Sequence, residues 1–280
     1  MKRIHLLYLC LFWVFCFGFL AFGQLRPLKT DDAETIPFGA FRIQTGVEGL
    51  RDQTFRLSGL KGNLSRYGVL GIFIGAGQAV EFQMEGSVVN ILRIKERFPA
   101  FTSNILQFKG DSTRSIGDLL IAAKFRLIKE QLGLPAVAFR FGAELPNAGN
   151  EKGIGNDETN FYASLMAAKS IGRLRAMVNM GIAILGDPTS ANSQNDLFTY
   201  GLAGIYNLNR LFDLVGEMYG RTGPGGPGTD DQSQIRLGLR AHTKNLYWDF
   251  SAVSGLAHDD PNIGFTFGVS YQFSLFRPGK

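Results

Sequence analysis

The chain has almost no cysteine: Cys10 and Cys16 are the two cysteines among its 280 residues. Both lie in an apolar N-terminal stretch that we expect to be removed, so the mature chain should contain none. A chain without cysteine cannot form disulfides, thiolate metal sites or a cysteine nucleophile. Histidine is nearly as scarce, with three residues, of which His5 lies in the same stretch. The usual catalytic and metal-binding side chains are therefore few.

Charged residues and long apolar runs are also scarce. Charged side chains make up 19% of the chain, where about 25% is usual for a soluble domain. After residue 24, no uncharged run reaches the roughly 20 apolar residues of a membrane-spanning helix, which excludes a polytopic helical protein. The hydrophobic content of 45% excludes a disordered chain, and the 35 glycines have no period of three, which excludes collagen.

The N-terminus has the pattern of an export signal. Lys2 and Arg3 form a basic start, residues 6–20 are almost wholly apolar, and Ala21-Phe22-Gly23 offers a small-x-small cleavage site. We expect a cleaved signal peptide over residues 1–23, with a retained anchor helix as the alternative because the apolar stretch is long. Removing two positive charges lowers the net charge from +5 to +3. Such a small excess, with no basic cluster, argues against a nucleic-acid partner.

Apolar and polar residues alternate with a period of two through the rest of the chain. Trp248 and Phe250, for example, alternate with Asp249 and Ser251. This period is typical of β-strands with two different faces. All ten prolines fall in proposed loops or at strand ends, as expected for a residue that cannot donate to a ladder. We predict twelve strands, near residues 39–50, 65–74, 79–93, 116–128, 135–145, 159–169, 174–185, 197–206, 211–221, 233–242, 246–255 and 263–273.

The predicted connections alternate between short and long. Tilted strands of about 9–11 residues can cross a bilayer, and short periplasmic turns with long external loops are typical of outer-membrane barrels. We therefore predict an all-β fold, a transmembrane antiparallel up-and-down β-barrel of about 12 strands over residues 39–280. A secreted soluble β protein is the alternative, since its strands alternate in the same way. The predicted short turns are residues 75–78, 170–173, 207–210 and 243–245, and the long loops are 51–64, 94–115, 146–158, 186–196, 222–232 and 256–262.

If the apolar face meets lipid, the polar face lines the lumen. That face carries seven positive and eight negative side chains, a balance that favours ion pairs over a filter for one sign of charge. Structural ion pairs are the simpler interpretation, and a charged ladder that binds a solute is the alternative. Asn90 falls on the apolar face, so we predict a bulge or a rim position there. The predicted lumen-facing residues are Arg42, Glu48, Glu81, Glu85, Asp118, Lys124, Arg126, Arg140, Glu144, Asp213, Glu217, Arg221, Arg236, Arg240 and Asp249.

The stretch between the cleavage site and the first strand, residues 24–38, is short enough to fold back into the periplasmic mouth of the barrel. We predict that it is a partial plug, in which Arg26, Asp31 and Asp32 pair with lumen charges. A flexible lead-in without contacts is the alternative, because that is the usual state of a terminus. The candidate partners are lumen charges such as Arg42 and Glu48.

Two parts of the chain resemble a known family. Leu25-Arg26-Pro27-Leu28-Lys29-Thr30-Asp31-Asp32-Ala33 resembles the start of the meta-pathway phenol-degradation transporter family of bacterial outer-membrane β-barrels. Gly117-Asp118, followed by Lys124, Arg126 and Leu127 and by Leu145-Pro146, is similar to a strand pair of that family. Asn147 departs from the pattern, because members usually have Thr or Ser there. The resemblance covers the whole mature chain and implies a Gram-negative barrel related to hydrophobic-solute channels, while its phenol label rests on pathway context.

Motifs for catalysis, cofactors and metals are lacking. His242 ends a predicted strand, His258 lies in an acidic loop, and neither has a paired serine. Residues 223–228 match a dinucleotide-binding glycine pattern in spacing, but prolines interrupt them and a strand follows where a helix is required. We therefore predict no enzyme activity, no cofactor and no metal site.

Two functions fit these features. The first is an outer-membrane barrel for the passage of small, apolar or aromatic solutes. The second is a structural or interaction barrel with a filled lumen and functional external loops, since side chains can nearly fill a bore of twelve strands. The expected partners are outer-membrane lipid and lipopolysaccharide, the barrel-assembly machinery and a small-molecule solute. The machinery is expected because the last strand alternates aromatic residues and ends at Phe273.

Overall fold

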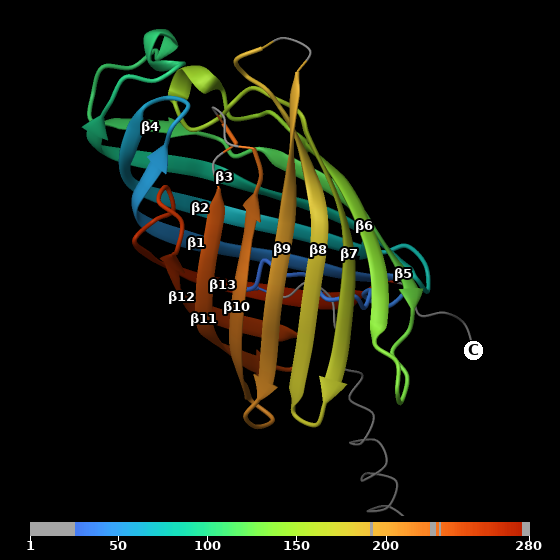
Figure 1. Ribbon diagram of the computed structural model, residues 1–280. Helices are drawn as coiled ribbons and strands as arrows, with labels where there is room; N and C mark the ends of the chain where they lie inside the picture. Colours follow the sequence, from blue (N-terminus) through green and yellow to red (C-terminus); the bar gives the residue numbers. More distant parts are fainter. Residues whose placement is uncertain (1–25, 191–192, 225–227, 230, 276–280) are drawn as a thin grey trace, which may run out of the picture.

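The computed structural model describes residues 26–190, 193–224, 228, 229 and 231–275, so the predicted signal peptide lies outside the described residues. Within these ranges, no helix is long and apolar enough to span a membrane. Two single-turn 3-10 helices, η1 (Ser103–Ile105) and η2 (Asn150–Lys152), accompany thirteen strands (Figure 1).

The strands form one antiparallel sheet that closes on itself. Its closure joins the first and last strands, which pair from Ala40 with Ser274 to Arg51 with Ile263. Twelve long strands make the wall, and one short strand, β4, pairs with β3 next to β5. The predicted up-and-down barrel of about twelve strands is therefore confirmed. The strands are β1 (Ala40–Phe55), β2 (Leu60–Gly75), β3 (Val80–Arg97), β4 (Ser112–Ser115), β5 (Leu119–Ile128), β6 (Ala136–Leu145), β7 (Asn160–Ile171), β8 (Leu174–Gly186), β9 (Gln194–Asn207), β10 (Phe212–Thr222), β11 (Gln232–Thr243), β12 (Leu246–Gly255) and β13 (Ile263–Ser274).

The barrel is polar inside and apolar outside. In β12, Trp248 and Phe250 are 42% and 52% exposed, whereas Asp249 and Ser251 are 2% and 0% exposed. A soluble barrel would bury the aromatic rings and expose the aspartate. An outer surface of this kind suits lipid, because aromatic and aliphatic side chains need no hydrogen-bond partner there. The inverted pattern favours the membrane alternative over the soluble one.

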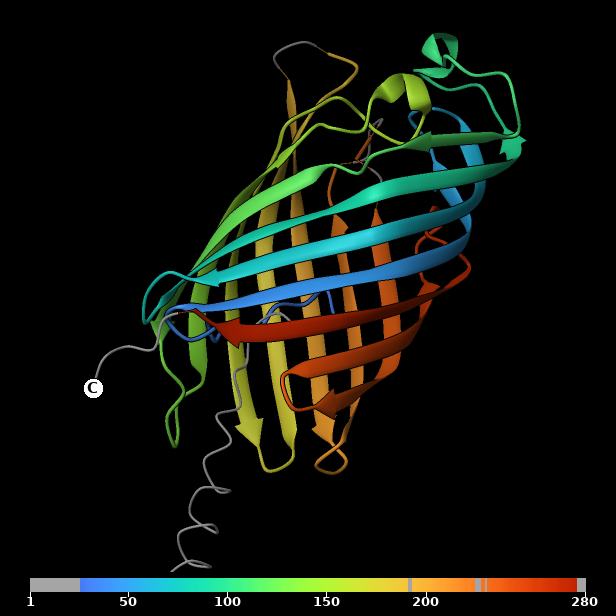
Figure 2. The ribbon, with the colours of Figure 1, turned by 180° about the vertical axis from the view of Figure 1, so that it is seen from behind.

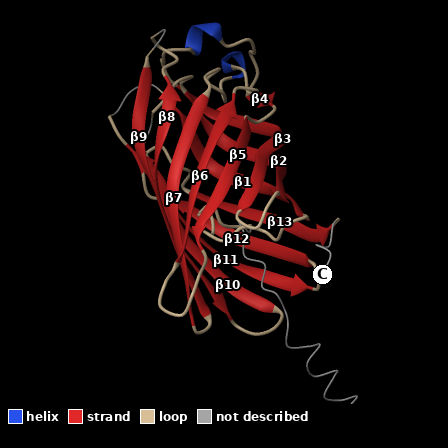
Figure 3. Cartoon of the chain, turned by 90° about the vertical axis from the view of Figure 1, so that its right-hand side faces the viewer, coloured by secondary structure: helices blue, strands red, loops and turns tan. Residues whose placement is uncertain are grey.

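The two ends of the barrel differ (Figure 3). At one end, here named the short-turn end, the strands are joined by residues 76–79, 172–173, 208–211 and 244–245. At the opposite, long-loop end, residues 98–111 and 146–159 contain η1 and η2. The predicted alternation of short and long connections is confirmed for these segments.

The predicted loop over residues 51–64 is wrong. The two strands continue past its ends, with Gln53 opposite Gly62 and Phe55 opposite Leu60, so that the turn is residues 56–59 alone. The charged residues of this stretch concealed its strand character, because near the rim of a barrel both faces can be polar. Its inner face is stabilised by an apolar cluster of Leu50, Leu60, Leu64, Leu92 and Val253.

The predicted strand over residues 116–128 is present as β5, but it begins three residues later than predicted. Residues 116–118 separate β4 from β5, and the predicted loop over residues 94–115 shortens to 98–111. Asn90, which had no place in the predicted alternation, lies after a change of phase in β3. Glu81 and Gln83 are buried at odd positions, but Asn90 and Leu92 are buried at even positions. Such a change requires an irregularity of the bulge type in the wall.

Candidate functional site

The N-terminal segment, residues 26–39, lies inside the barrel (Figure 2). Ala33 and Ile36 are fully buried, and the Asp31 and Asp32 carboxylates are only 2% and 3% exposed. Burying a carboxylate is costly unless it is paired and hydrogen-bonded. The position of this segment therefore depends on the cations and donors that the wall supplies.

Arg26 contacts the wall where β1, β12 and β13 are adjacent. Its Nε lies 3.4 Å from Oδ2 of Asp249, and its Nη2 donates to Oγ1 of Thr266 at 3.0 Å. Gly46 and Gly268, opposite each other on β1 and β13, leave the space that the guanidinium occupies. The glycine pair thus forms a seat for this arginine.

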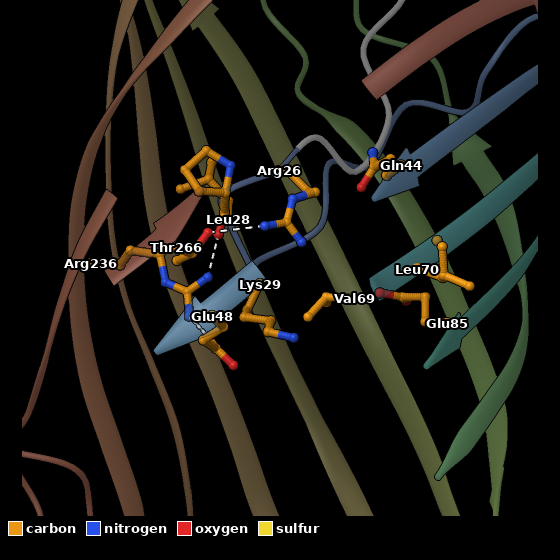
Figure 4. Close-up of a pocket in the computed structure, with 12 residues that line it drawn as sticks. Arg26, Leu28, Lys29, Gln44, Glu48, Val69, Leu70, Glu85, Arg236 and Thr266 are labelled. Carbon is orange, nitrogen blue, oxygen red and sulfur yellow. Dashed lines mark hydrogen bonds and ion pairs between the residues drawn. The ribbon is translucent and has the colours of Figure 1, made fainter. Parts of the chain in front are cut away.

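Glu217 and Arg236 hold the backbone of the segment. The amide of Lys29 donates to both carboxylate oxygens of Glu217, at 2.8 and 2.9 Å. Arg236 donates to the carbonyl oxygen of Pro27, and its guanidinium lies 3.3 Å from Oε1 of Glu48. Figure 4 shows Arg236 and Glu48 next to the segment, with Lys29 directed into the same space.

Asp31 belongs to a buried network with Lys124, Glu81 and Gln83. Nζ of Lys124 lies 3.1 Å from Oδ1 of Asp31 and 3.2 Å from Oε1 of Glu81. Gln83 donates to the same two carboxylates at 2.9 and 2.8 Å. The second oxygen of Glu81 accepts from the amide of Ile36 at 2.8 Å. One wall network therefore binds both a side chain and the backbone of the segment.

Asp32 forms a bidentate salt bridge with Arg175 on β8. The guanidinium donates to both carboxylate oxygens, at 2.8 and 2.6 Å, and it also contacts Glu130 in the turn between β5 and β6. Burial acts to raise the pKa of Glu130, but the hydrogen bond from the Ser170 amide and the charge of Arg175 outweigh burial. The pKa of Glu130 therefore lies below its ordinary value of 4.5.

Glu34 completes the charged contacts of the segment. Its Oε2 accepts from Nη1 of Arg126 at 2.5 Å, and its Oε1 accepts from the amide of Glu130 at 3.3 Å. The segment is thus joined to β5 near the short-turn end as well as to the opposite wall through Arg26.

The segment also covers an apolar patch on the inner wall, which the predicted alternation did not reveal. Leu28 and Ala33 pack against this patch, so that apolar packing supplements the ion pairs. Several of its members are alanines, whose small side chains let the segment approach the wall closely. The patch consists of Ala136, Ala138, Met166, Ala168, Met177, Ala203, Ile205 and Val215.

Other predicted lumen charges pair with the wall itself. Arg240 donates to Oδ2 of Asp213 at 3.0 and 2.6 Å, and the ring of His242 contacts the same carboxylate at 2.5 Å. Arg42 is 1% exposed and donates to Gln272 at 3.1 and 2.6 Å. These contacts are the structural ion pairs and hydrogen bonds that the balance of charge favours.

The remaining predicted residues lie nearer the long-loop half of the lumen. Arg140 lies 2.9 Å from Glu85, and Glu144 accepts from Tyr162 at 2.9 Å. Asp118 accepts from two amides of the loop after β6, at 2.9 and 2.8 Å. Arg221 lines the main cavity described next.

The lumen is hollow on the long-loop side of the segment. A cavity of about 380 Å³ extends from Lys29 and Glu48 to the loops at that end. A second cavity of about 240 Å³ adjoins it at Arg66 and Glu144. The space between Arg26 and Lys29, at the level of the segment, is only about 40 Å³ (Figure 4). The bore is therefore closed at the segment and open beyond it.

Arg175, Glu130 and Gln83 have important contacts that sequence analysis missed. Arg175 is the single charged residue of β8, in which Asn179 is the one other polar residue, and Glu130 lies in a turn, so neither belonged to an obvious polar face. Alternation along β8 places Arg175 on the same face as Met177. Both residues are buried, so this face is the inner one. Among the residues that the structure describes, no group of three or more His, Cys, Asp or Glu could hold a metal ion.

Comparison with known proteins gives one matching family and several solved structures with a similar fold. Residues 26–273 match the family described as "Putative MetA-pathway of phenol degradation". The COG4313 outer membrane channel from Pseudomonas putida F1 is similar in structure, with a TM-score of 0.64, 14% identity, and coverage of 89% of this chain and 100% of that one. The NanC porin has a TM-score of 0.52 and 10% identity, covering 82% of this chain and 98% of that one. No curated protein matches in sequence.

Proposed function

The chain belongs to the family described as "Putative MetA-pathway of phenol degradation", and from this premise we propose that it is an outer-membrane barrel for the passage of small apolar or aromatic solutes. The proposal rests on one observation above all, the hollow half of the lumen. A cavity of about 380 Å³ exceeds the roughly 150 Å³ that is enough to hold benzene in an engineered protein cavity.

The lining of this cavity is mixed, and polar groups make up the larger part of it. Leu50, Phe55 and Leu185 supply apolar surface that can contact an aromatic ring, while Tyr219 and Gln234 supply polar groups that can orient a ring substituent. Charged side chains, among them Lys29, Glu48, Arg66 and Arg221, line the rest of the cavity. The seven positive and eight negative side chains predicted for the lumen nearly balance, so they give no strong net field that would select one sign of ion.

The N-terminal segment acts in this proposal as a partial plug at the short-turn end, which faces the periplasm. Passage along the axis requires that the segment move, since the space around Arg26 is too small for a solute. The role is transport and not catalysis.

The outer surface fits the membrane partners of such a barrel. The apolar belt would contact outer-membrane lipid and the lipid part of lipopolysaccharide. The barrel-assembly machinery would recognise β13, where Phe265, Phe267 and Tyr271 are exposed on one face.

A structural or interaction barrel is the second candidate, and the dense contacts between the segment and the wall favour it. In that case the lumen would stay closed and the loops at the long-loop end would perform the function. The two candidates make different predictions for a barrel that lacks the segment.

The decisive experiment compares the refolded mature protein with a variant that lacks residues 24–37. We expect low ion conductance of the full protein in planar bilayers and a clear increase in the variant, because water replaces the segment. Intact cells that express the full protein should accumulate radiolabelled toluene faster than cells without it. Unchanged conductance together with no gain in toluene uptake would leave the structural barrel as the better account. Heat-modifiable migration on a gel controls for folding of both proteins.

A further inference from the structure

The outer face of the barrel wall carries positive side chains on β3 and β4, which lie side by side near the long-loop end (Figure 1). Leu92 on β3 and Thr113 on β4 are 0% and 5% exposed, so both face inward. Arg93 and Arg114, the residues that follow them, are exposed and face outward. Arg114 pairs with Ile91, two residues before Arg93, so these two residues, here named the arginine pair, are diagonal neighbours. Such positions are about 7–8 Å apart, within reach of long side chains.

Two further cations lie beside the arginine pair. Lys95 is the next outward position of β3, because Ile94 packs against the inner apolar cluster, and its Nζ lies 2.5 Å from Oδ1 of Asp52. Arg51 on β1 is opposite Ile263, which is 53% exposed on the lipid-facing surface. Positive charge therefore exceeds negative charge on this part of the outer face.

The arginine pair has no partner in the protein. Within the part of the chain that the structure describes, neither Arg93 nor Arg114 has a hydrogen bond or an ion pair to another residue. By contrast, Nη2 of the nearby Arg97 donates to the carbonyl oxygen of Gly110 at 2.8 Å. A guanidinium has five donors in a planar fork that matches two oxygens of a phosphate. The pair therefore offers its donors to an anion that approaches from outside the barrel.

The arginine pair does not belong to a basic ring around the barrel. In the described parts of β5 to β13, the outward positions near the long-loop end carry no lysine or arginine. Arg221 and Arg236, the basic residues nearest that end on β10 and β11, lie on the lumen side of the wall. Glu96 alternates with Lys95 along β3 and so belongs to the inner face. An anion that binds to the outer wall at this height should therefore bind on one side of the barrel.

The arginine pair lies at the edge of the apolar belt. Arg93 is thirteen residues beyond Val80, the start of β3 near the short-turn end, which is about 43 Å along the strand at about 3.3 Å per residue. With a strand tilt of about 45° this is roughly 30 Å from the short-turn end, just past an apolar belt of about 25 Å. Lipid head groups lie at this height, so the pair can contact a charged head group without entering the apolar layer.

An apolar hollow lies on the outer wall between the arginine pair and the middle of the belt. Its volume is about 240 Å³, and its lining includes Leu70, Met84, Val88 and Ile116. These four side chains are 40%, 43%, 50% and 51% exposed, in the same order. Ile116 is two residues after Arg114, so the hollow begins next to the pair. A phosphate-binding pair above an apolar hollow matches a ligand that has an anionic head and an acyl chain.

From these observations we infer that the arginine pair binds a phosphate group of lipopolysaccharide, and that an acyl chain of the same molecule lies in the outer hollow. Lipopolysaccharide fills the outer leaflet of the outer membrane, and its lipid A part joins phosphorylated sugars to several acyl chains. Phospholipids of the inner leaflet would meet the opposite, short-turn end of the wall. The inference rests on the membrane orientation in the proposed function, with the long-loop end outside the cell, and not on transport.

The first test removes the arginine pair. The refolded protein in detergent is titrated with bisphosphorylated lipid A, and native mass spectrometry measures the bound fraction. We expect the double variant Arg93→Gln, Arg114→Gln to bind roughly tenfold more weakly or worse, because it loses charge-assisted hydrogen bonds. Arg173→Gln with Arg210→Gln is the matched control, since both arginines are exposed in short turns and the charge change is the same. The control should bind lipid A like the wild type, and heat-modifiable migration shows that each variant is folded.

The second test varies the ligand. Lipid A without its phosphates should bind weakly and equally to the wild type and to the double variant, because the arginine pair then has no anion to contact. Inorganic phosphate at the same concentration should not displace lipid A, because it has no acyl chain for the hollow. Phosphatidylglycerol should bind more weakly than lipid A, since it carries one phosphodiester charge. Equal binding of lipid A with and without phosphates, displacement by inorganic phosphate, or tighter binding of phosphatidylglycerol would overturn the inference.

A labelling experiment separates this inference from the function on which it rests. Asn104 is exposed in η1, so Asn104→Cys should react with a membrane-impermeant maleimide on intact cells if the long-loop end is outside. Absence of labelling would overturn the orientation, and with it both the lipid site and the periplasmic position of the plug. Labelling together with equal lipid A affinity of the wild type and the double variant, or with an equal loss in the control, would overturn the lipid site alone. Toluene uptake no faster than that of cells without the barrel would overturn the proposed transport and leave the lipid site standing.

Discussion

Gly46 and Gly268 face each other across β1 and β13, and the guanidinium of Arg26 fills the space that a side chain at either position would need. A Cβ at Gly46 would lie 2.5 Å from Nη2 of Arg26. Side chains on the inner face of a strand normally occupy this space, so the glycine pair and the arginine together form one seat for the N-terminal segment. The barrel wall is thus shaped for this segment and does not merely enclose it.

Gly268→Ala should therefore displace Arg26 from Asp249 and Thr266 and loosen the start of the segment. We expect a higher single-channel conductance, because Arg26 is the contact of the segment with β12 and β13. Gly216→Ala is the control, since a Cβ there meets the flexible, lipid-facing Leu237 at 3.0 Å and not the segment. Unchanged conductance in a Gly268→Ala barrel that still shows heat-modifiable migration would contradict this role of the seat.

The Asp32–Arg175 contact permits a double-mutant cycle. Arg175→Met should lower the free energy of unfolding by about 3–5 kcal/mol, because it leaves the buried Asp32 carboxylate without its cation. Asp32→Asn should cost less, because Arg175 keeps its contact with Glu130. The double variant should lose less than the sum of the two, since neither charge remains. Unfolding in urea, followed by heat-modifiable migration, measures all four proteins. A strictly additive double variant would show that the two residues do not interact.

Glu130 makes the stability of the folded barrel depend on pH. Its pKa in the folded protein lies below the ordinary value of 4.5, so ionised Glu130 stabilises the folded state above that pH. This contribution is lost as pH falls through the lowered folded pKa. Thermal unfolding between pH 7 and pH 3 should therefore show a steeper acid loss for the wild type than for Glu130→Gln. Parallel curves for the two proteins would be the contrary result.

The wall of the barrel could be predicted from the sequence because alternation depends only on local pattern. Trp248, Asp249, Phe250 and Ser251 lie on the faces that their order predicts, with the aromatic rings outside. The pattern fails near the rim, where both faces can be polar or both apolar. This is why the pairing of Phe55 with Leu60 was taken for part of a loop.

The contacts of the N-terminal segment were harder to predict, because they join residues that are far apart in sequence. Asp32 and Arg175 are separated by 143 positions, and no local pattern relates them. The start of β5 was predicted too early for a related reason. Residues 116–118 precede an alternating stretch, and only the three-dimensional pairing shows that they leave the sheet.

Two lumen arginines test whether burial decides how much an ion pair of the wall contributes to the stability of the barrel. Arg240 is 3% exposed, and its partner Asp213 also contacts His242, whereas the Arg140 side chain is 18% exposed and lies beside Glu85 in the hollow half of the lumen. Arg240→Glu would place a second buried carboxylate against Asp213, which water cannot screen. It should destabilise the barrel by at least the roughly 3–5 kcal/mol of a broken buried pair. Arg140→Glu should cost much less, about 1 kcal/mol, because solvent reaches both partners. The temperature at which gel migration changes orders the two variants, and an equal shift for both would show that the buried half of the lumen is as hydrated as the hollow half.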